Sequence, residues 1–324
     1  MLHSLWFPML YGLALFLFGM KVMEGALQRW AGPRLHQWLH YAAATPLKGM
    51  LTSAGLTALL QSSTAVTVIT IGFANAGLLG QAGILGIILG TNIGTTLTTE
   101  LISLNIGAAA FPLLLLSLLI WAGSIIWNEM VLSRSSSPWL GRLEQLQFLC
   151  LAVAGFAMVL LGITVMQSIG KPLQEMGVFA WFLEQAERSS GWGILAGAML
   201  TALMHSSAAV VAMTMSLCLS GALPPELGVA MVLGSNVGTC VTAILAAAGS
   251  TPAGRFVAGS HLALNIGGVI LFAPLLPLLT QVSGQLAGDP AGQIAHAQTI
   301  FNVVCSLLAL PLCYLPVWKK AAAS

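Results

Sequence analysis

Two short polar motifs interrupt apolar stretches of this sequence, and their residue types suit the binding of an anion. The first reads Gln61-Ser62-Ser63-Thr64 and the second reads His205-Ser206-Ser207-Ala208. If a half-helix begins at the first serine of each motif, its first N–H groups lack intrahelical partners and carry partial positive charge. Such an end can bind an oxyanion without lysine or arginine. The residues predicted to bind substrate are Gln61, Ser62, Ser63, Thr64, His205, Ser206 and Ser207.

One further motif follows each of these, at residues 90–96 after the first and at residues 234–240 after the second. Both contain an asparagine, Asn92 or Asn236, which is costly at membrane depth unless it is satisfied internally, and we predict that both contact substrate. The flanking glycines either permit unwinding and close approach of the hairpin or merely pack helices, and the sequence does not separate the two roles. Hydroxyl and freed carbonyl oxygens suit a hard cation such as Na⁺. The predicted Na⁺ ligands are Thr91, Thr95, Ser235, Thr239, Ser63 and Ser207.

Charge indicates that the anion and the cation bind together. Lysine and arginine are absent near all four motifs. A multivalent anion therefore needs more positive charge than helix dipoles supply, and co-bound Na⁺ would provide it.

The motifs are copies of one another at a fixed separation. A shift of 144 residues aligns Thr57–Thr70 with Thr201–Thr214, and 8 of these 14 positions are identical. The same shift pairs residues 90–96 with 234–240 without a gap. Small-residue helix packing explains the glycine and serine content but not the shared order. The sequence therefore indicates an internal duplication.

The composition requires a membrane. Of 324 residues, 57% are hydrophobic and 6% are charged, whereas soluble domains carry about 25% charged residues. The net charge of +2 excludes a basic stripe for nucleic acid. The N-terminus lacks the features of a cleaved signal peptide, and all five cysteines lie in apolar runs, where we expect them to pack as small hydrophobes.

Seven runs are long enough to cross a bilayer. They lie at 7–27, 81–103, 106–127, 147–168, 226–248, 260–282 and 293–316. The motif-bearing stretches 47–78 and 191–222 are interrupted at their centres, and we interpret them as re-entrant hairpins that enter and leave on one side. The fold class expected is an all-α integral membrane domain over 1–324. Two inverted repeats, about 5–128 and 146–283, contain broken helices, and a further C-terminal helix spans about 293–316.

The distribution of basic residues predicts the orientation. With non-crossing hairpins, nine basic residues fall on one side, namely Lys21, Arg29, Arg34, Lys48, Arg134, Arg142, Arg255, Lys319 and Lys320. Only Lys171 and Arg188 fall on the other. The positive-inside rule then places the N-terminus outside and the C-terminus in the cytoplasm. Three crossings per repeat make the two copies oppositely oriented, with the site at the midplane, as in secondary transporters.

The motifs resemble those of the bacterial Na⁺/phosphate cotransporters related to the animal type II sodium–phosphate cotransporters. The resemblance rests on Gln61–Thr64, on Gly90–Thr96, on their second copies and on His261–Asn265 and Gln298–Asn302, which look like a His-x-x-Phe-Asn pattern. It implies an inner-membrane carrier for inorganic phosphate coupled to Na⁺, without an organic cofactor. The sequence departs from the pattern at His205, at Gln298 and at Leu264, and it ends at Ser324 without the soluble domain found in many relatives.

Several polar residues could have a structural role in place of a role in binding. His205 either donates to the anion or bonds a neighbouring helix. His261, Asn265, Gln298 and Asn302 form two i,i+4 pairs that we expect to fix helix contacts beside the site. Glu100 is either a helix-end residue in water or a ligand of Na⁺ or H⁺, and 171–189 is expected to form an amphipathic surface helix.

Other functions compete with a coupled phosphate carrier. A carrier or exporter of another oxyanion and a passive anion channel could both use helix ends. An intramembrane enzyme is disfavoured because Asp289 is the only aspartate and the histidines lack ligand spacing with carboxylates. A scaffold without substrate is disfavoured by the cost of the buried polar residues. Homo-oligomers and the direction of transport stay open.

Overall fold

The computed structural model describes residues 2–32, 37–38, 41–42, 44–104, 106–132, 140–168 and 170–320. The described part is all helical and contains no strand. Two of the basic residues counted for the orientation, Arg34 and Arg134, lie outside it. The contacts divide the chain into two compact units, Met1–Pro33 with Asn105–Ile169 and Arg34–Leu104 with Gly170–Ser324.

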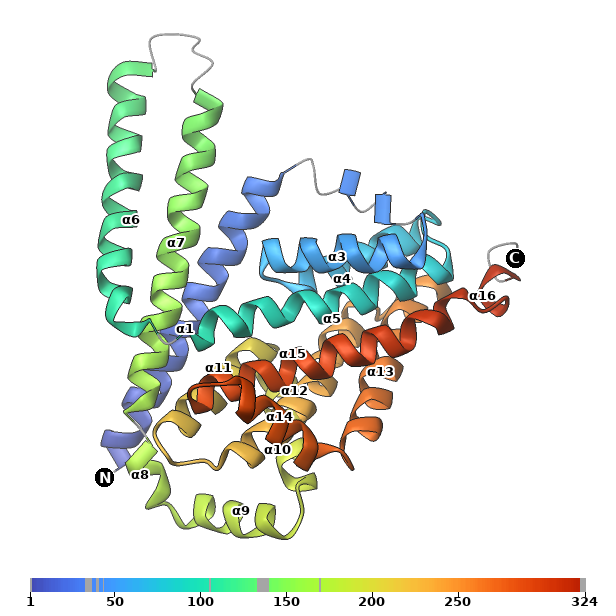
Figure 1. Ribbon diagram of the computed structural model, residues 1–324. Helices are drawn as coiled ribbons and strands as arrows, with labels where there is room; N and C mark the ends of the chain where they lie inside the picture. The colour runs from blue at the N-terminus through green and yellow to red at the C-terminus, as the bar shows by residue number, and fades with distance from the viewer. Residues whose placement is uncertain are drawn as a thin grey trace. The chain divides into compact units, whose positions relative to one another are not determined.

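The first unit consists of α1 (Leu2–Ala31), α6 (Gly107–Trp127), a π-helical turn (Asn128–Leu132) and α7 (Leu140–Gln167). Helix α7 contacts both α1 and α6, as Figure 1 shows. Glycines let α1 and α7 approach closely, because a Cβ on Gly19 would lie 2.6 Å from the carbonyl oxygen of Gly155. Lys21 Nζ and Glu24 Oε2 form an ion pair at 2.9 Å on α1.

The second unit holds every motif that the sequence singles out. Its first copy consists of α3 (Pro46–Leu60), α4 (Ser63–Asn75) and α5 (Gln81–Ser103), and its second of α10 (Gly191–Met204), α11 (Ser207–Leu219) and α12 (Pro225–Ala246). The remaining elements are α8 (Gly170–Gln174), α9 (Gly177–Arg188), α13 (Pro252–Phe272), α14 (Leu276–Leu286), α15 (Pro290–Ala309), the 3-10 turn η2 (Leu310–Tyr314) and α16 (Val317–Lys320). In Figure 1, α15 runs beside α5, in agreement with their contacts.

The two copies have matching element boundaries. Moved by 144 residues, α4 coincides with α11 at both ends, and α5 coincides with α12 to within one residue. Both short helices end before a glycine with positive φ, Gly77 at 71° and Gly221 at 73°. Glycine alone adopts this backbone region without steric cost. The membrane orientation of the copies stays a prediction.

Seven helices are long and apolar enough to cross a membrane, in agreement with the predicted number. They are Phe7–Ala31, Gln81–Ser103, Gly107–Met130, Gly141–Gln167, Pro225–Ala246, Pro252–Phe272 and Pro290–Tyr314. By contrast, α4, α10 and α11 have 13, 14 and 13 residues, which is too short to span. The chain is a multi-span membrane protein.

The predicted span at 260–282 is wrong in its boundaries. Helix α13 starts earlier, at Pro252, where the Thr251 side chain accepts a hydrogen bond from Gly254 N. It ends at Phe272, because Pro274 lacks the N–H that would continue the helix, and α14 follows as a separate element. The Thr-Pro start signal and the proline stop are both visible in the sequence.

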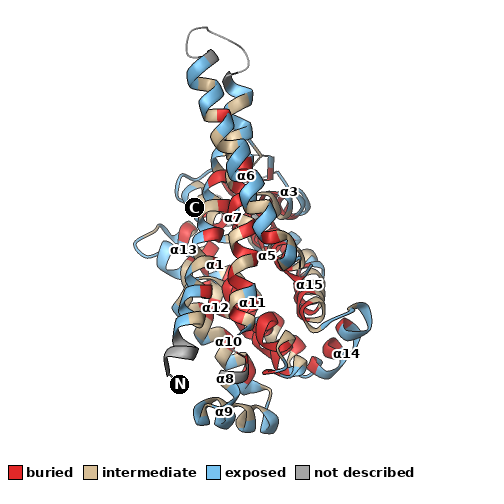
Figure 2. Cartoon of the chain, turned by 90° about the vertical axis from the view of Figure 1, so that its left-hand side faces the viewer, coloured by how far each residue is buried: buried red, intermediate tan, exposed pale blue. Residues whose placement is uncertain are grey.

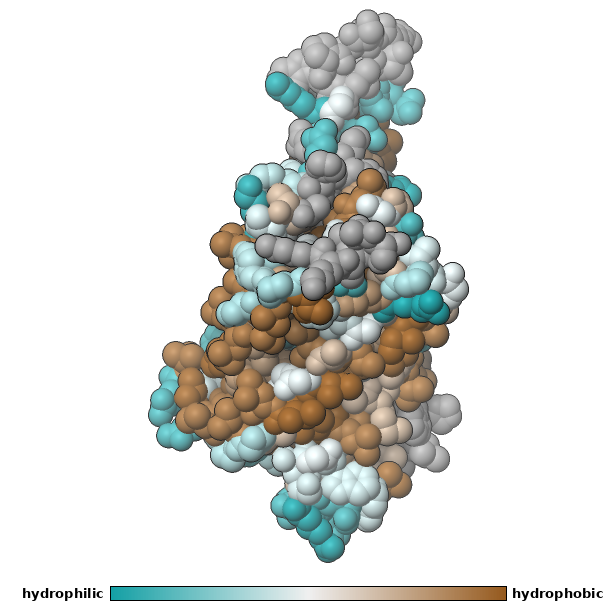
Figure 3. Space-filling model, turned by 90° about the vertical axis from the view of Figure 1, so that its right-hand side faces the viewer, coloured by the Kyte–Doolittle hydropathy of each residue, from teal (hydrophilic) through white to brown (hydrophobic). Residues whose placement is uncertain are grey.

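The surface of the described part is that of a membrane protein. Figure 2 shows buried residues concentrated on α11 and α12, whereas only three residues of α6 are buried. Figure 3 shows a broad apolar band on one face, with hydrophilic residues at the end where α9 lies in Figure 1. Four of the five cysteines are buried, Cys305 is half-buried and none is paired, as expected.

A stripe of small residues seats α3 on α5. A Cβ on Gly90 would overlap Ser53 Oγ and the carbonyl oxygen of Met50, and one on Gly94 would lie 2.5 Å from the carbonyl oxygen of Ala54. Ser53 Oγ donates across the interface to the carbonyl oxygen of Ile87 at 2.8 Å.

The second copy repeats this contact between α10 and α12. A Cβ on Gly234 would overlap the carbonyl oxygen of Ile194, and one on Gly238 would overlap that of Ala198. Both α5 and α12 are continuous helices through their glycines. The interpretation that these glycines permit unwinding is therefore wrong, and close packing is their role.

Gly90→Ala is expected to destabilise the protein by about 1–3 kcal/mol, because the added methyl group must displace backbone. Gly55→Ala on α3 is the matched control, since a Cβ there meets nothing within 4 Å. Alanine favours helix over glycine, so the control should melt at the same temperature or higher. Thermal unfolding in detergent, followed by size-exclusion chromatography, measures both. Equal melting temperatures for the two variants would contradict the close contact.

Candidate functional site

Each motif begins with a break between two half-helices. Gln61 (φ 54°) and His205 (φ 53°) are the only non-glycine residues of the described chain with positive φ. Each is followed by an N-cap serine whose side chain accepts from the backbone N–H three residues on, Ala65 for Ser62 and Ala209 for Ser206. The half-helices therefore begin at Ser63 and Ser207, one residue later than predicted. The left-handed residue and the cap together turn the chain sharply at both positions.

The two breaks differ in exposure. Gln61 is buried, and its side-chain amide donates back to the carbonyl oxygen of Ala58 on α3. Ser62 is likewise buried. His205, at the equivalent position, is exposed, and Ser206 is half-buried. We call the two breaks the tips. In this conformation the first tip, at Gln61, is covered by protein, and the second tip, at His205, is open.

A narrow cleft brings together residues from both copies. Ser63 and Thr64 on α4 face Thr239 on α12 and His261 on α13. These residues were predicted separately as substrate ligands, a Na⁺ ligand and a supporting residue, and they share one cleft. The cleft is too narrow for a water-sized sphere, so it must widen to admit an ion.

Two further hydroxyls line this cleft and were missed in the sequence. Thr67 lies one helical turn after Ser63, and Thr242 lies one turn after Thr239. Residues three or four apart share a helix face, so the spacing was the available signal. The cleft is consequently richer in hydroxyls than the motifs alone indicate.

A chain of side-chain hydrogen bonds leads from this cleft. His261 Nε2 donates to Asn92 Oδ1 at 3.2 Å, and Asn92 Nδ2 donates to Asn265 Oδ1 at 3.4 Å. Asn265 Nδ2 in turn donates to the carbonyl oxygen of His261 at 2.9 Å. The remaining ring nitrogen, His261 Nδ1, is buried without a partner. Asn92 thus connects α5 to α13, and one nitrogen of His261 is free to accept.

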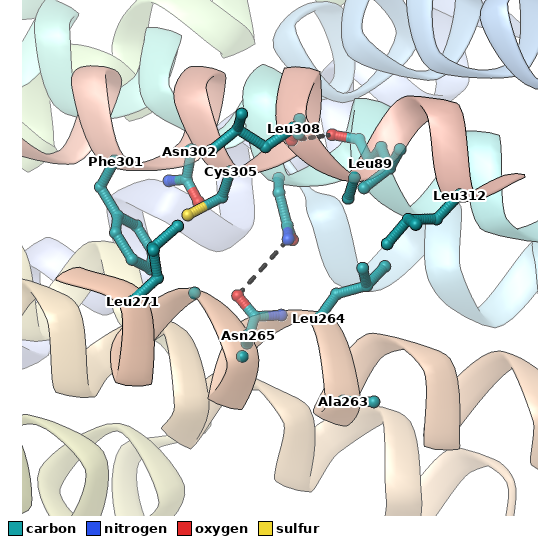
Figure 4. Close-up of a pocket in the computed structure, with 15 residues that line it drawn as sticks. Leu89, Ala263, Leu264, Asn265, Leu271, Phe301, Asn302, Cys305, Leu308 and Leu312 are labelled. Carbon is teal, nitrogen blue, oxygen red and sulfur yellow. Dashed lines mark hydrogen bonds between the residues drawn. The ribbon is translucent and has the colours of Figure 1, made fainter.

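A larger cavity of about 270 Å³ lies at the other end of the chain of hydrogen bonds, between α5, α13 and α15. Figure 4 shows Asn265 and Asn302 on opposite helices of this cavity, surrounded by leucines and by Phe301. Asn302 Nδ2 and both polar atoms of the neighbouring Gln298 are buried without partners. The walls are mainly apolar, so this cavity does not suit a multivalent anion.

Most of the other predicted ligands make their hydrogen bonds within their own helix. Asn236 Nδ2 donates to the carbonyl oxygen of Val232, and the hydroxyls of Thr91, Thr95, Ser235 and Thr239 each donate to a carbonyl oxygen of the preceding turn. The hydroxyl oxygens of all four keep lone pairs that can face a cation. Ser207 is buried at the start of α11, and the cleft around Ser63 does not include the second motif.

The arrangement can bind an oxyanion by donation alone. The first N–H groups of α4 have no carbonyl partner in their own helix, and five hydroxyl groups line the cleft at this helix start. Within the described residues no group of three His, Cys, Asp or Glu side chains could hold a transition metal.

Ser62→Ala should lower stability by about 1 kcal/mol, because the N–H of Ala65 loses its cap. Ser206→Ala should lower it by a similar amount, since its bond to Ala209 is equivalent. Asparagine is also a good N-cap, so Ser62→Asn is the control that should retain stability. Thermal unfolding of the four proteins measures this. An Ala variant that melts like wild type would refute the capping role.

Several known proteins are similar to this chain over most of its length. The similar proteins include "Uncharacterized protein YqeW" of Bacillus subtilis (strain 168), 34% identical over 297 residues, which are 92% of this chain and 91% of that protein. They also include "Putative inorganic phosphate export protein YjbB" of Escherichia coli (strain K12) and of Salmonella typhimurium, 25% and 24% identical over 303 residues. The alignment covers 94% of this chain but about half, 53%, of the YjbB proteins.

No solved structure matches the chain significantly. The family model described as "Na+/Pi-cotransporter" matches residues 15–168 and 170–304, which include every motif discussed above. The chain therefore belongs to the Na⁺/Pi-cotransporter family.

Proposed function

We propose that this protein carries inorganic phosphate across the inner membrane together with Na⁺, by alternating access. One observation carries the proposal. A capped half-helix start, with Ser63 and Thr64 at its first two positions, opens into a hydroxyl-lined cleft shared with the other copy. Membership of the Na⁺/Pi-cotransporter family and the printed name of the YjbB relatives support the same substrate.

The cleft suits phosphate for three chemical reasons. The N–H groups at the start of α4 and its helix dipole favour negative charge. The hydroxyls of Ser63, Thr64 and Thr67 are donors that can surround a tetrahedral oxyanion. The free nitrogen of His261 is an acceptor, and hydrogen phosphate carries an O–H that can donate to it. Sulfate has no such proton at neutral pH, so the cleft offers a physical basis for discrimination.

Na⁺ is proposed as a second substrate that offsets the charge of the anion. Lysine and arginine are absent from the residues that line the cleft. Thr239 and Thr242 supply oxygen atoms from α12, and Ser63 supplies one from α4. The other hydroxyls proposed as Na⁺ ligands are Thr91, Thr95, Ser235 and Ser207.

The unequal tips favour a carrier over a passive channel. The first tip, at Gln61, is covered, and the second, at His205, is exposed. A channel needs one continuous open path, whereas a carrier exposes its two halves alternately. The closed cleft at Ser63 agrees with a state in which one side is sealed.

Ser63→Ala and Thr64→Val are expected to weaken phosphate binding by about 10- to 100-fold each, since each removes one hydrogen bond to a charged group. Isothermal titration of the purified protein with phosphate, in NaCl and in choline chloride, measures affinity and Na⁺ dependence. Sulfate should bind much more weakly than phosphate to wild type. Ser117→Ala is the control, because this serine is buried in α6 of the other unit. Wild-type affinity in both cleft variants would exclude the cleft as the site.

The orientation can be tested with described residues. Cysteine in place of Lys48, at the start of α3, should react with a membrane-impermeant maleimide from the cytoplasmic side, and cysteine in place of Arg188 from the outside. The native protein is the blank, since four of its cysteines are buried and Cys305 is half-buried. Labelling from the opposite sides would show that the topology is reversed.

The direction of transport and its coupling to Na⁺ are tested in proteoliposomes. Phosphate uptake driven by an imposed inward Na⁺ gradient would show Na⁺-coupled import. Phosphate transport that does not respond to the gradient would contradict the coupling to Na⁺.

A further inference from the structure

An acid–base pair lies on two helices that also carry site residues. Glu100 Oε1 on α5 accepts a hydrogen bond from His296 Nδ1 at 3.1 Å and another from Thr299 Oγ1 at 2.5 Å, both on α15. The side chains of Glu100 and His296 are 28% and 33% exposed, so both are partly accessible. Glu100 is therefore more than a helix-end residue in water, because it joins two membrane-length helices.

We propose that Glu100 and His296 form a proton-binding site whose charge controls the affinity for the transported anion. The coupling to phosphate rests on the proposed function, whereas the binding of the proton does not. With neutral His296 the pair has a net charge of −1, and with one more proton from solvent it becomes neutral. Histidine is the side-chain type that proteins commonly use as a switch of charge near neutral pH.

A proton fits this place better than Na⁺. Hard cations require several oxygen ligands. The carboxylate oxygen of Glu100 is already occupied by two donors, and one of them, the imidazole N–H of His296, would repel a cation. Thr299 can also donate to the carbonyl oxygen of Ala295 at 3.1 Å, which frees the carboxylate to bind histidinium more closely.

The pair is placed to act on the candidate site through charge. Glu100 follows Asn92 by eight residues, which is about 12 Å along α5, and Asn92 is bonded to His261 in the cleft. At an effective dielectric constant near 20, one unit of negative charge at about 12 Å, its separation from Asn92, weakens the binding of a monovalent anion roughly tenfold, and the effect falls as the anion lies farther away. Protonation of the pair removes this repulsion. Acid should therefore strengthen anion binding.

Other titratable groups occur on the elements packed against α5 and α15. In the part of the chain with described side chains, none of these groups other than His296 lies within ion-pair distance of Glu100. They are Lys48 on α3, Cys218 on α11, Glu226 and Cys240 on α12, Arg255 and His261 on α13, Cys305 on α15, and Cys313 and Tyr314 in η2. His205 at the exposed tip is the rival group for a pH effect and is included in the test.

The proton site is tested first without phosphate. Histidine Cε1–H signals of the labelled full-length protein in detergent are followed by NMR from pH 5 to 8, and His296→Gln identifies its own signal by loss. We expect this signal to titrate in that range and its midpoint to rise when phosphate is added. A signal that does not titrate overturns the proposal, whatever the protein transports.

Phosphate affinity then tests the coupling. His296→Gln keeps the negative charge at every pH, so it should bind about as weakly at pH 6 as wild type does at pH 8. Glu100→Gln removes the charge and should bind roughly tenfold more tightly than wild type at pH 8. Glu226→Gln is the matched control and should behave as wild type. Each variant is compared with wild type at the same pH, because phosphate itself titrates in this window.

The outcomes separate the two proposals. The coupling is overturned if the phosphate affinities of wild type and His296→Gln depend on pH in the same way. It is also overturned if His205→Gln, rather than His296→Gln, loses the pH dependence of phosphate affinity. If His296→Gln does not fold, Glu100→Gln alone decides, since affinity equal to wild type at pH 8 overturns the coupling. If wild type binds no phosphate at any pH, the proposed function fails, while the NMR titration still decides whether the pair binds a proton.

Discussion

The structure depends on the close approach of each first half-helix to a long helix through glycine. Gly90 and Gly94 accept the backbone of α3, and Gly234 and Gly238 accept that of α10. Lipid offers no hydrogen bonds, so the interrupted backbone at the motifs survives only if protein surrounds it. A larger residue in these stripes would lift the half-helix away and leave the break unsupported. The glycines thus support the motif residues without lining the cleft.

The same contact explains how the two copies come together at one cleft. Helix α3 is fixed to α5 within its own copy, whereas α4, which follows the break, packs on α12 and α13. In the second copy α11 packs on α5 and α15. Each break is thereby followed by a helix that packs on the long helix of the other copy. Ser63 on α4 and Thr239 on α12 consequently place groups from both copies in one cleft. Movement of one copy against the other would open or close the cleft.

Much of this was predictable from sequence because the signals are local. The repeat register, the half-helix breaks and the number of membrane-length helices follow from motif order, hydroxyl positions and apolar length. The boundaries of α13 were predicted wrongly because apolar length was given more weight than the Thr251-Pro252 start and the Pro274 stop. The glycines were assigned two possible roles, and only the contacts between α3 and α5 decide between them.

The pairing of Glu100 with His296 could not have been predicted, because 196 residues separate the two and nothing in either copy indicates the contact. Its place in the fold nevertheless has a physical reason. Helices α5 and α15 run antiparallel, since Leu89 contacts Ser306 and Glu100 contacts His296. This alignment puts an acid and a base at the same level near the end of α5, while Asn92 and Asn302 line one cavity at another level. The link to the cleft runs through α5, because Asn92 on this helix is hydrogen-bonded to His261. A change of charge at Glu100 and binding in the cleft therefore act on one helix, which is the condition for the two events to be coupled.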